Sequence, residues 1–185
     1  MINPHMTDRI NNQTIQAALL LLSMAFFRFF PEQAYAKAVL QEVQAIKVSD
    51  GDTVSLMIKG KIVKTRLIGI DAPEMGQRPW GKQAKDRLID IMNHAEWTVL
   101  METDVVKNDK FGRPLVYLWT KQNELINERM VLEGQALLFI IPPNVKYANR
   151  LRKAEQRSRQ EKKGIWGLKG LKENPARYRE KHPRK

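Results

Sequence analysis

Three short segments of this chain combine carboxylates, arginines and turn residues in ways that could support chemistry. The first, Asp50 to Thr53, has the sequence DGDT, and the second, Arg66 to Glu74, has the sequence RLIGIDAPE. The third, Asp109 to Leu115, has the sequence DKFGRPL. Carboxylate oxygens are hard donors that suit Ca²⁺ or orient a water, and the planar guanidinium of arginine matches the oxygens of a phosphate.

Taken together, the segments supply the groups that hydrolysis of a phosphodiester requires. Asp52 and Asp71 are suited to binding Ca²⁺. Glu74 can orient or deprotonate a water, and Arg66 and Arg113 can hold phosphate oxygens. The combination indicates function more strongly than any one segment does.

Each segment also has a purely structural interpretation. The DGDT and DKFGRPL segments are typical of hairpin turns, in which aspartate bonds to nearby backbone amides. The carboxylates after the second segment's strand could form only a surface salt bridge with Arg66, which would stabilise little. Against this, Arg66 lies among apolar strand residues, where arginine is costly without a buried partner or an anionic ligand.

These segments must be positioned by strands, and runs of apolar and branched residues, which alternate with polar ones at 54–58, predict five of them. The predicted strands are 39–48, 54–58, 61–70, 97–102 and 115–119. The second and third form a hairpin around Lys59-Gly60. Five strands are the number that an OB-type barrel needs.

Helical periodicity predicts three helices between and after the strands. They cover residues 79–93, 124–133 and a stretch from Asn144 to Gly164, whose outer faces are rich in Lys and Arg. The predicted fold class is α+β, a five-stranded OB-fold β-barrel with three packed helices.

The ends of the chain have compositions unlike the middle. Residues 15–27 form an apolar run typical of a signal peptide, and Ala34-Tyr35-Ala36 offers a cleavage site. We therefore expect residues 1–36 to be a signal peptide or an N-terminal anchor, followed by an OB-fold domain at 37–167. Residues 168–185 are basic with few apolar side chains, and we expect them to be a disordered tail.

Net charge points to polyanionic partners. Lys and Arg number 32 against 20 Asp and Glu, which gives a net charge of +12. Such a surface attracts nucleic acid or an anionic membrane. The chain has no cysteine, which excludes disulfides, thiolate metal sites and cysteine nucleophiles.

The order of the three segments, followed by a basic helix ending in Gly164-Ile165-Trp166, closely resembles the staphylococcal (thermo)nuclease family. The resemblance covers roughly Val39 to Gly167. It implies an OB-fold enzyme that hydrolyses DNA and RNA with little sequence specificity, depends on calcium and leaves 3′-phosphate ends.

The resemblance also implies the metal site. Asp52 and Asp71 match the family's calcium-binding carboxylates, and Ala72 matches a position that contributes its backbone carbonyl. Ala72 replaces a threonine, which removes a hydroxyl group but keeps the carbonyl. Asp50 matches a supporting residue near the metal.

The remaining site residues follow in the same way. Glu74 matches the proposed general base, and Arg66 and Arg113 match the arginines that hold the scissile phosphate. Lys110 and Leu115 match positions beside the bound nucleotide.

Two departures from the family concern the nucleotide rather than the reaction. Phe111 stands where tyrosine is common, and residues 138–141 lack the tyrosines that stack on the nucleotide in the best-known member. Stacking contributes about 1–3 kcal/mol per base, so base preference is the property most affected.

Two functions from other classes remain alternatives. An OB-type barrel can bind nucleic acid without cutting it. A basic protein with an apolar N-terminal segment can also act at a membrane surface. For the nuclease we expect secretion or a periplasmic location, with membrane anchoring if the leader is not cleaved, and a monomer without an obligate protein partner.

Overall fold

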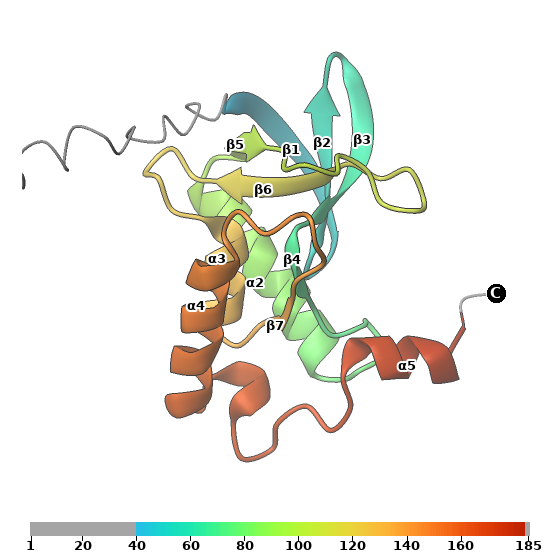
Figure 1. Cartoon of the computed structure of the whole chain (residues 1–185), viewed down its shortest axis with the longest axis vertical. Helices are drawn as coiled ribbons and strands as arrows, with labels where there is room; N and C mark the ends of the chain where they lie inside the picture. The colour runs from blue at the N-terminus through green and yellow to red at the C-terminus, as the bar shows by residue number, and fades with distance from the viewer. Residues whose placement is uncertain (1–39, 184–185) are drawn as a thin grey trace, which may run out of the picture. The chain divides into compact units, whose positions relative to one another are not determined.

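The predicted strands close into a barrel, as the computed structural model shows for residues 40–183 (Figure 1). Its strands are β1 (Gln41–Asp50), β2 (Thr53–Ile58), β3 (Lys61–Leu67), β5 (Thr98–Glu102) and β6 (Leu115–Trp119). Their order around the barrel is β1-β2-β3-β6-β5, and β5 pairs with β1 to close it. All pairs are antiparallel except β3 with β6, which are parallel.

Period-two alternation explains why these segments form a barrel with a filled interior. Val43 and Ala45 of β1 are buried with Gln44 exposed between them, and an irregularity between Ala45 and Lys47 shifts the next buried residue to Val48. Leu56 and Leu67, from the next two strands, are also buried. Side chains of alternate residues point to one face of a strand, and here that face forms the core.

The long strand predicted at 61–70 is interrupted. β3 ends at Leu67, and β4 (Gly69–Asp71) pairs instead with β7 (Leu137–Phe139) in a separate two-stranded sheet. Gly69 has a positive φ of 81°, which breaks the strand and redirects the chain. This turn sets the direction of β4 and so the position of Asp71 at its end.

Helices cover one end of the barrel. They are α2 (Trp80–His94), α3 (Ile126–Leu132) and α4 (Ala148–Gln160), followed by the 3₁₀ turn η1 (Gly164–Trp166). In Figure 1 these helices lie below the barrel strands. They agree with the three predicted helices except for a few residues at their ends, so the α+β fold class is confirmed. No helix within residues 40–183 is long and apolar enough to cross a lipid bilayer.

The C-terminal segment differs from the disordered tail that we predicted. Residues 175–181 form a further helix, α5 (Pro175–Lys181), in which Pro175 is buried. Figure 1 shows α5 away from α4, near the chain that follows β4. Its order does not come from a core of its own but from contacts with the functional site described below. The proposed leader, residues 1–36, lies outside the described residues.

Candidate active site

Asp52 lies at the turn between β1 and β2, where Asp50 pairs with Thr53 in a two-residue hairpin. The residue is only 2% exposed. Its Oδ2 accepts a hydrogen bond from the Ala72 backbone N–H at 2.7 Å, and its Oδ1 accepts one from the Thr53 hydroxyl at 3.0 Å. The Asp50 carboxylate accepts a bond from the Asp52 N–H at 3.3 Å. The first and second sequence segments therefore meet at this buried carboxylate.

Helix α2 packs closely against the first and second sequence segments. A Cβ atom at Gly51 would lie 2.6 Å from the Ala84 Cβ and 2.7 Å from the Ala72 Cβ. A Cβ atom at Gly81 would lie 2.1 Å from the Glu74 carbonyl oxygen. Only glycine fits at these two approaches, so the packing of α2 fixes the backbone that carries Asp52 and Glu74.

Arg66 of β3 connects the two aspartates. Its Nη1 lies 2.5 Å from Asp52 Oδ1, and its Nη2 lies 2.7 Å from Asp71 Oδ1. The guanidinium is 17% exposed, whereas the carboxylates are 3% and 5% exposed. The arginine that was unexpected in an apolar strand thus has buried partners, and part of it still faces solvent.

Burial controls the electrostatics of Asp52. It raises the pKa of the Asp52 carboxyl from 3.8 to about 8, against the opposing effect of the Arg66 charge. The neighbouring Asp50 and Asp71 raise the Asp52 pKa further. Burial lowers the pKa of Arg66, but Asp52 and Asp71 outweigh this effect and raise the pKa, so Arg66 stays charged. Negative charge is in excess at this site, and an added cation would favour ionised Asp52.

This shift predicts how stability changes with pH when no metal is bound. Because its pKa is raised, folded Asp52 retains its proton to a higher pH than the unfolded chain, which releases it near 3.8. The contribution of Asp52 to stability is therefore full below pH 3.8 and is lost as the pH rises towards 8. In Asp52→Asn this loss is absent. We expect the melting temperature of the wild type, relative to Asp52→Asn, to fall between about pH 5 and pH 8 in chelator.

Thermal denaturation of both proteins across that range checks the prediction. Asp86→Asn serves as the matched control, because the Asp86 side chain is 49% exposed on α2. Its difference from the wild type should stay constant across the range. A constant difference for Asp52→Asn as well would show that Asp52 is ionised throughout.

Glu74 follows β4 and lies beside Asp71. Its side chain is 17% exposed. The Glu74 backbone N–H donates to the side-chain oxygen of Gln77 at 2.9 Å, which fixes the loop. The carboxylate is close to the buried aspartates but accessible enough to meet a water.

An arginine that sequence analysis did not select completes the cluster. Arg179 of α5 donates to Glu74 Oε1 at 2.8 Å and to both oxygens of Asp71 at 3.1 and 3.0 Å. The signal for α5 was present in Asn174-Pro175, since Asn174 caps the helix by accepting from the Arg177 N–H at 2.8 Å. No local pattern, however, indicates that this helix meets Asp71.

Arg113 lies near the cluster in the fold but is held by a different carboxylate. Its loop precedes β6, where Leu115 is in register with Arg66, and the Arg66 N–H donates to the Pro114 carbonyl at 2.9 Å. The guanidinium of Arg113 donates through Nε to Asp109 Oδ2 at 2.7 Å. The parallel pairing therefore places the backbone of the third segment beside Arg66, while the Arg113 side chain is bound within its own loop.

Cationic and aromatic side chains occupy the same loop. Phe111 is 71% exposed, and the Lys110 Nζ lies 5.1 Å from its ring centroid. The Arg113 guanidinium lies 5.5 Å from that centroid. This loop offers the Phe111 ring and the Lys110 charge to solvent, whereas Leu115 is partly buried at the start of β6.

The oxygen atoms of Asp52, Asp71 and Ala72 are of the type that binds a hard cation. Asp52 and Asp71 supply buried carboxylates, and the Ala72 backbone is tied to Asp52. Residues 40–183 contain no group of three or more His, Cys, Asp or Glu side chains arranged around one point. The ligand set implied by the resemblance needs only two such side chains, with a backbone carbonyl.

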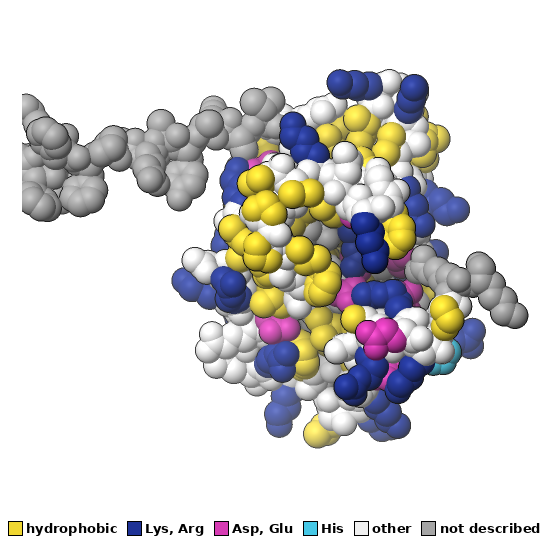
Figure 2. Space-filling view, turned by 45° about the vertical axis from the view of Figure 1, so that its right-hand side comes forward, with side chains coloured by type: hydrophobic (Ala, Val, Ile, Leu, Met, Phe, Trp, Pro, Cys, Tyr) yellow, Lys and Arg dark blue, Asp and Glu magenta, His cyan; other side chains and the backbone are white. Residues whose placement is uncertain are grey.

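A recess lies beside these residues, and its lining includes the acidic Asp50 and Glu74 and the basic Lys64 and Arg179. Figure 2 shows carboxylates set back among Lys and Arg side chains on one face. Asp50, Asp52, Arg66, Asp71 and Glu74 are brought together directly by hydrogen bonds, ion pairs or loop connections. Such a site can bind a cation, activate a water and bind an anionic oxygen.

Comparisons with known proteins agree with this geometry. The sequence model of the family described as Staphylococcal nuclease homologue matches residues 64–167. The chain is 32% identical to Thermonuclease of Staphylococcus hyicus over 160 residues, which cover 82% of this chain and 93% of that relative. It is 32% identical to Thermonuclease of Staphylococcus intermedius over 125 residues, or 65% and 73% of the two chains. It is 28% identical to Endonuclease YncB of Bacillus subtilis over 137 residues, or 71% and 64%. The match spans more than half of the chain, and we conclude that this protein belongs to the staphylococcal nuclease family.

Proposed function

We propose that this protein is a nuclease that hydrolyses phosphodiester bonds of DNA and RNA with little sequence specificity. The observation that carries the proposal is the Arg66 guanidinium, which bonds to both Asp52 and Asp71 beside Glu74. The names of the similar proteins, thermonuclease and endonuclease, support the same activity.

The proposed metal is calcium. The two carboxylates of Asp52 and Asp71 and the Ala72 carbonyl would hold it, and all three are oxygen donors of the kind that Ca²⁺ prefers. When bound, the ion supplies polarisation of a phosphate oxygen and neutralises developing negative charge. The carboxylates of Asp50 and Asp71 around the buried Asp52 provide the physical reason for this site to accept a cation, which would also favour ionisation of Asp52.

The reaction that the side chains support is attack of water on phosphorus. Glu74 accepts a proton from the water while the water oxygen bonds to phosphorus. The bond between phosphorus and the 5′ oxygen then breaks. The leaving oxygen takes up a proton, and the phosphate remains on the 3′ side. Arg66 and Arg113 donate hydrogen bonds to the phosphate oxygens as charge builds up on them.

The protein can bind its substrate without recognising the base sequence of the nucleic acid. The net charge of +12 attracts the phosphate backbone, and exposed cations such as Arg152 and Lys153 line α4. Several other α4 cations are in ion pairs, including Arg150 with Glu128 and Arg159 with Glu155. Non-specific, salt-sensitive binding follows from contacts of this kind.

We also propose that the protein is exported, on the basis of its sequence. The apolar run at 15–27 and the small residues of Ala34-Tyr35-Ala36 support a cleaved leader. A secreted or periplasmic location follows, and an uncleaved leader would instead anchor the protein in a membrane.

A degradation assay tests the activity. The full-length chain is incubated with DNA and with RNA in the presence of calcium, of magnesium, or of a chelator. We expect both substrates to be cut with calcium and spared with chelator, and the products to carry 3′ ends that a phosphatase can dephosphorylate. Binding without cutting in every condition would identify a non-catalytic nucleic-acid-binding module instead.

A further inference from the structure

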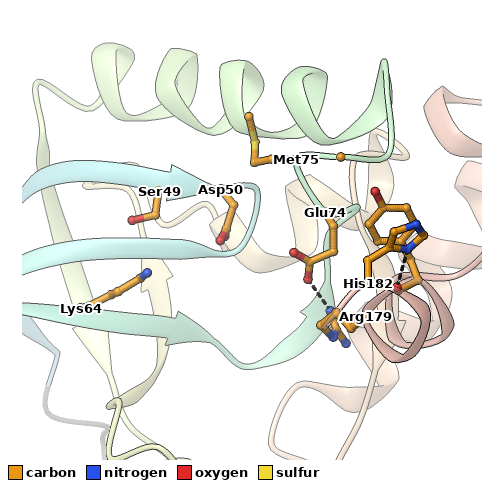
Figure 3. Close-up of a pocket in the computed structure, with 9 residues that line it drawn as sticks. Ser49, Asp50, Lys64, Glu74, Met75, Arg179 and His182 are labelled. Carbon is orange, nitrogen blue, oxygen red and sulfur yellow. Dashed lines mark hydrogen bonds and ion pairs between the residues drawn. The ribbon is translucent and has the colours of Figure 1, made fainter. Parts of the chain in front are cut away.

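The C-terminal helix α5 places a guanidinium on the residues that the proposed metal and water would use. Arg179 bonds to both oxygens of Asp71 at 3.1 and 3.0 Å and to Glu74 Oε1 at 2.8 Å. Figure 3 shows Glu74 and Arg179 pointing toward one another across the cavity between the barrel and α5. The residues joined by this contact are 108 and 105 positions apart in the chain.

Docking of α5 does not depend on Arg179 alone. The Gln77 amide donates to the Glu173 carbonyl at 2.7 Å, while its oxygen accepts from the Glu74 N–H at 2.9 Å. The Tyr178 hydroxyl lies so near Gly76 that a Cβ atom there would be 2.2 Å away. The loop that carries Glu74 is thus the surface on which α5 rests.

Charge explains why an arginine binds at this point. Asp50, Asp71 and Glu74 contribute three carboxylates beside the buried Asp52, and Arg66 compensates part of their charge. Arg179 adds a second guanidinium in a bidentate contact with Asp71, an arrangement stronger than a single neutral hydrogen bond.

The same contact conflicts with a bound divalent cation. Asp71 Oδ1 already accepts from Arg66 and Arg179, and its Oδ2 accepts from Arg179. A cation coordinated by Asp71 would need one of these oxygens and would bring two positive charges beside the guanidinium. Arg179 and the cation therefore compete for the same carboxylate.

We propose that α5 is an internal competitor of the divalent cation: Arg179 docks on Asp71 and Glu74 when the cation is absent, and the cation displaces it. The proposal rests on the proposed calcium site. Docking occupies the oxygens of Asp71 and Glu74 that the cation and the water would use, so it opposes activation at low calcium. The segment lies beyond residues 64–167, which match the family model.

Because of this competition, the apparent affinity for calcium equals the intrinsic affinity multiplied by the fraction of molecules in which α5 is undocked. If α5 is docked in 90–99% of molecules, its release tightens calcium binding about 10- to 100-fold. The effect is one of binding and can be measured without any turnover of substrate.

Calorimetric titration of calcium chloride into full-length protein tests the proposal. We expect Arg179→Gln to bind calcium about 10-fold or more tightly than the wild type. Gly76→Ala should also bind more tightly, because it pushes Tyr178 away while the Arg179 charge is kept. Arg177→Gln is the matched control, since it removes the same charge from an exposed position of α5 and should leave the affinity unchanged.

Hydrogen exchange of residues 173–183 gives a second readout. In the wild type, calcium should speed exchange of the α5 amides, and in Arg179→Gln these amides should exchange fast without it. The competition would be ruled out if the wild type, Arg179→Gln and Gly76→Ala bound calcium equally and calcium did not change the protection of α5. The proposed calcium site would be unaffected by that result. Absence of calcium binding in all of the proteins would reject both.

Discussion

Glu74→Gln lowers the turnover number for DNA by about two to four orders of magnitude if Glu74 is the general base. Glutamine keeps the size of the side chain but cannot accept a proton from the attacking water. The loop should keep its shape, because the Glu74 contact with Gln77 is made by the backbone N–H. Steady-state kinetics on DNA at saturating calcium measure the effect, and the loss should fall on kcat rather than on KM.

Glu42→Gln is the control for the lost charge. Glu42 lies on β1, at the opposite end from Asp50, and its side chain is 59% exposed. It should turn over as the wild type does. Turnover of Glu74→Gln within a few-fold of the wild type would remove Glu74 from the mechanism.

Arg113→Ala should lower kcat by about two to three orders of magnitude, as removal of one charge-stabilising donor typically does. In this structure the guanidinium is bound to Asp109 Oδ2, so catalysis requires it to turn toward the substrate phosphate. Asp109 also accepts from the Phe111 and Arg113 backbone N–H groups at 2.9 Å, and these bonds survive the substitution. The loop should therefore stay folded while its activity is lost.

A melting curve and nuclease kinetics on the same samples check this prediction. Arg152→Ala on α4 is the control, because Arg152 is exposed and its side chain bonds only locally, to Asn149. We expect its kcat to be unchanged and its binding to weaken slightly. If Arg113→Ala retains full turnover with an unchanged melting temperature, Arg113 serves only to brace its loop through Asp109.

Arg66 is a poorer test residue, although its assigned role is the same. Its removal leaves Asp52 and Asp71 buried without their shared partner, and loss of one member of a buried ion pair typically destabilises by about 3–5 kcal/mol. Loss of activity in Arg66→Ala would combine unfolding with catalysis. Substitutions of Arg113 and Glu74 separate loss of catalysis from unfolding, because the contacts of these two residues lie at the margin of the cluster.

Local patterns predicted most of the fold. Runs of apolar and branched residues identified all five barrel strands, and side chains at helical spacing identified α2 and α4, with α3 as a looser helical stretch. The three-residue strand β7 was missed because so short a strand has no recognisable pattern, and β4 was predicted as the end of the third strand because the break at Gly69 was not foreseen. The tail was expected to be disordered because its composition cannot form a core, and that inference failed because α5 rests on another part of the molecule.

The bracing of the site was also beyond the reach of local patterns. Asn127 of α3 is completely buried and bonds to the Ile68 carbonyl at 2.9 Å and to the Leu118 N–H at 3.0 Å. It joins α3 to β6 and to the break between β3 and β4. A polar residue inside a helical pattern gives no indication of such a bridge until the partners are known.

The sequence by itself determined the chemical groups and the elements that bear them. Turn residues around Asp52, the strand that carries Arg66 and the Asp-x-Pro-Glu segment ending in Glu74 follow from the preferences of neighbouring residues. Tertiary structure decided which groups meet: Arg66 between Asp52 and Asp71, Gly51 against α2, and Arg179 on Asp71. These contacts join residues as much as 108 positions apart, and they depend on how the elements pack rather than on any local preference.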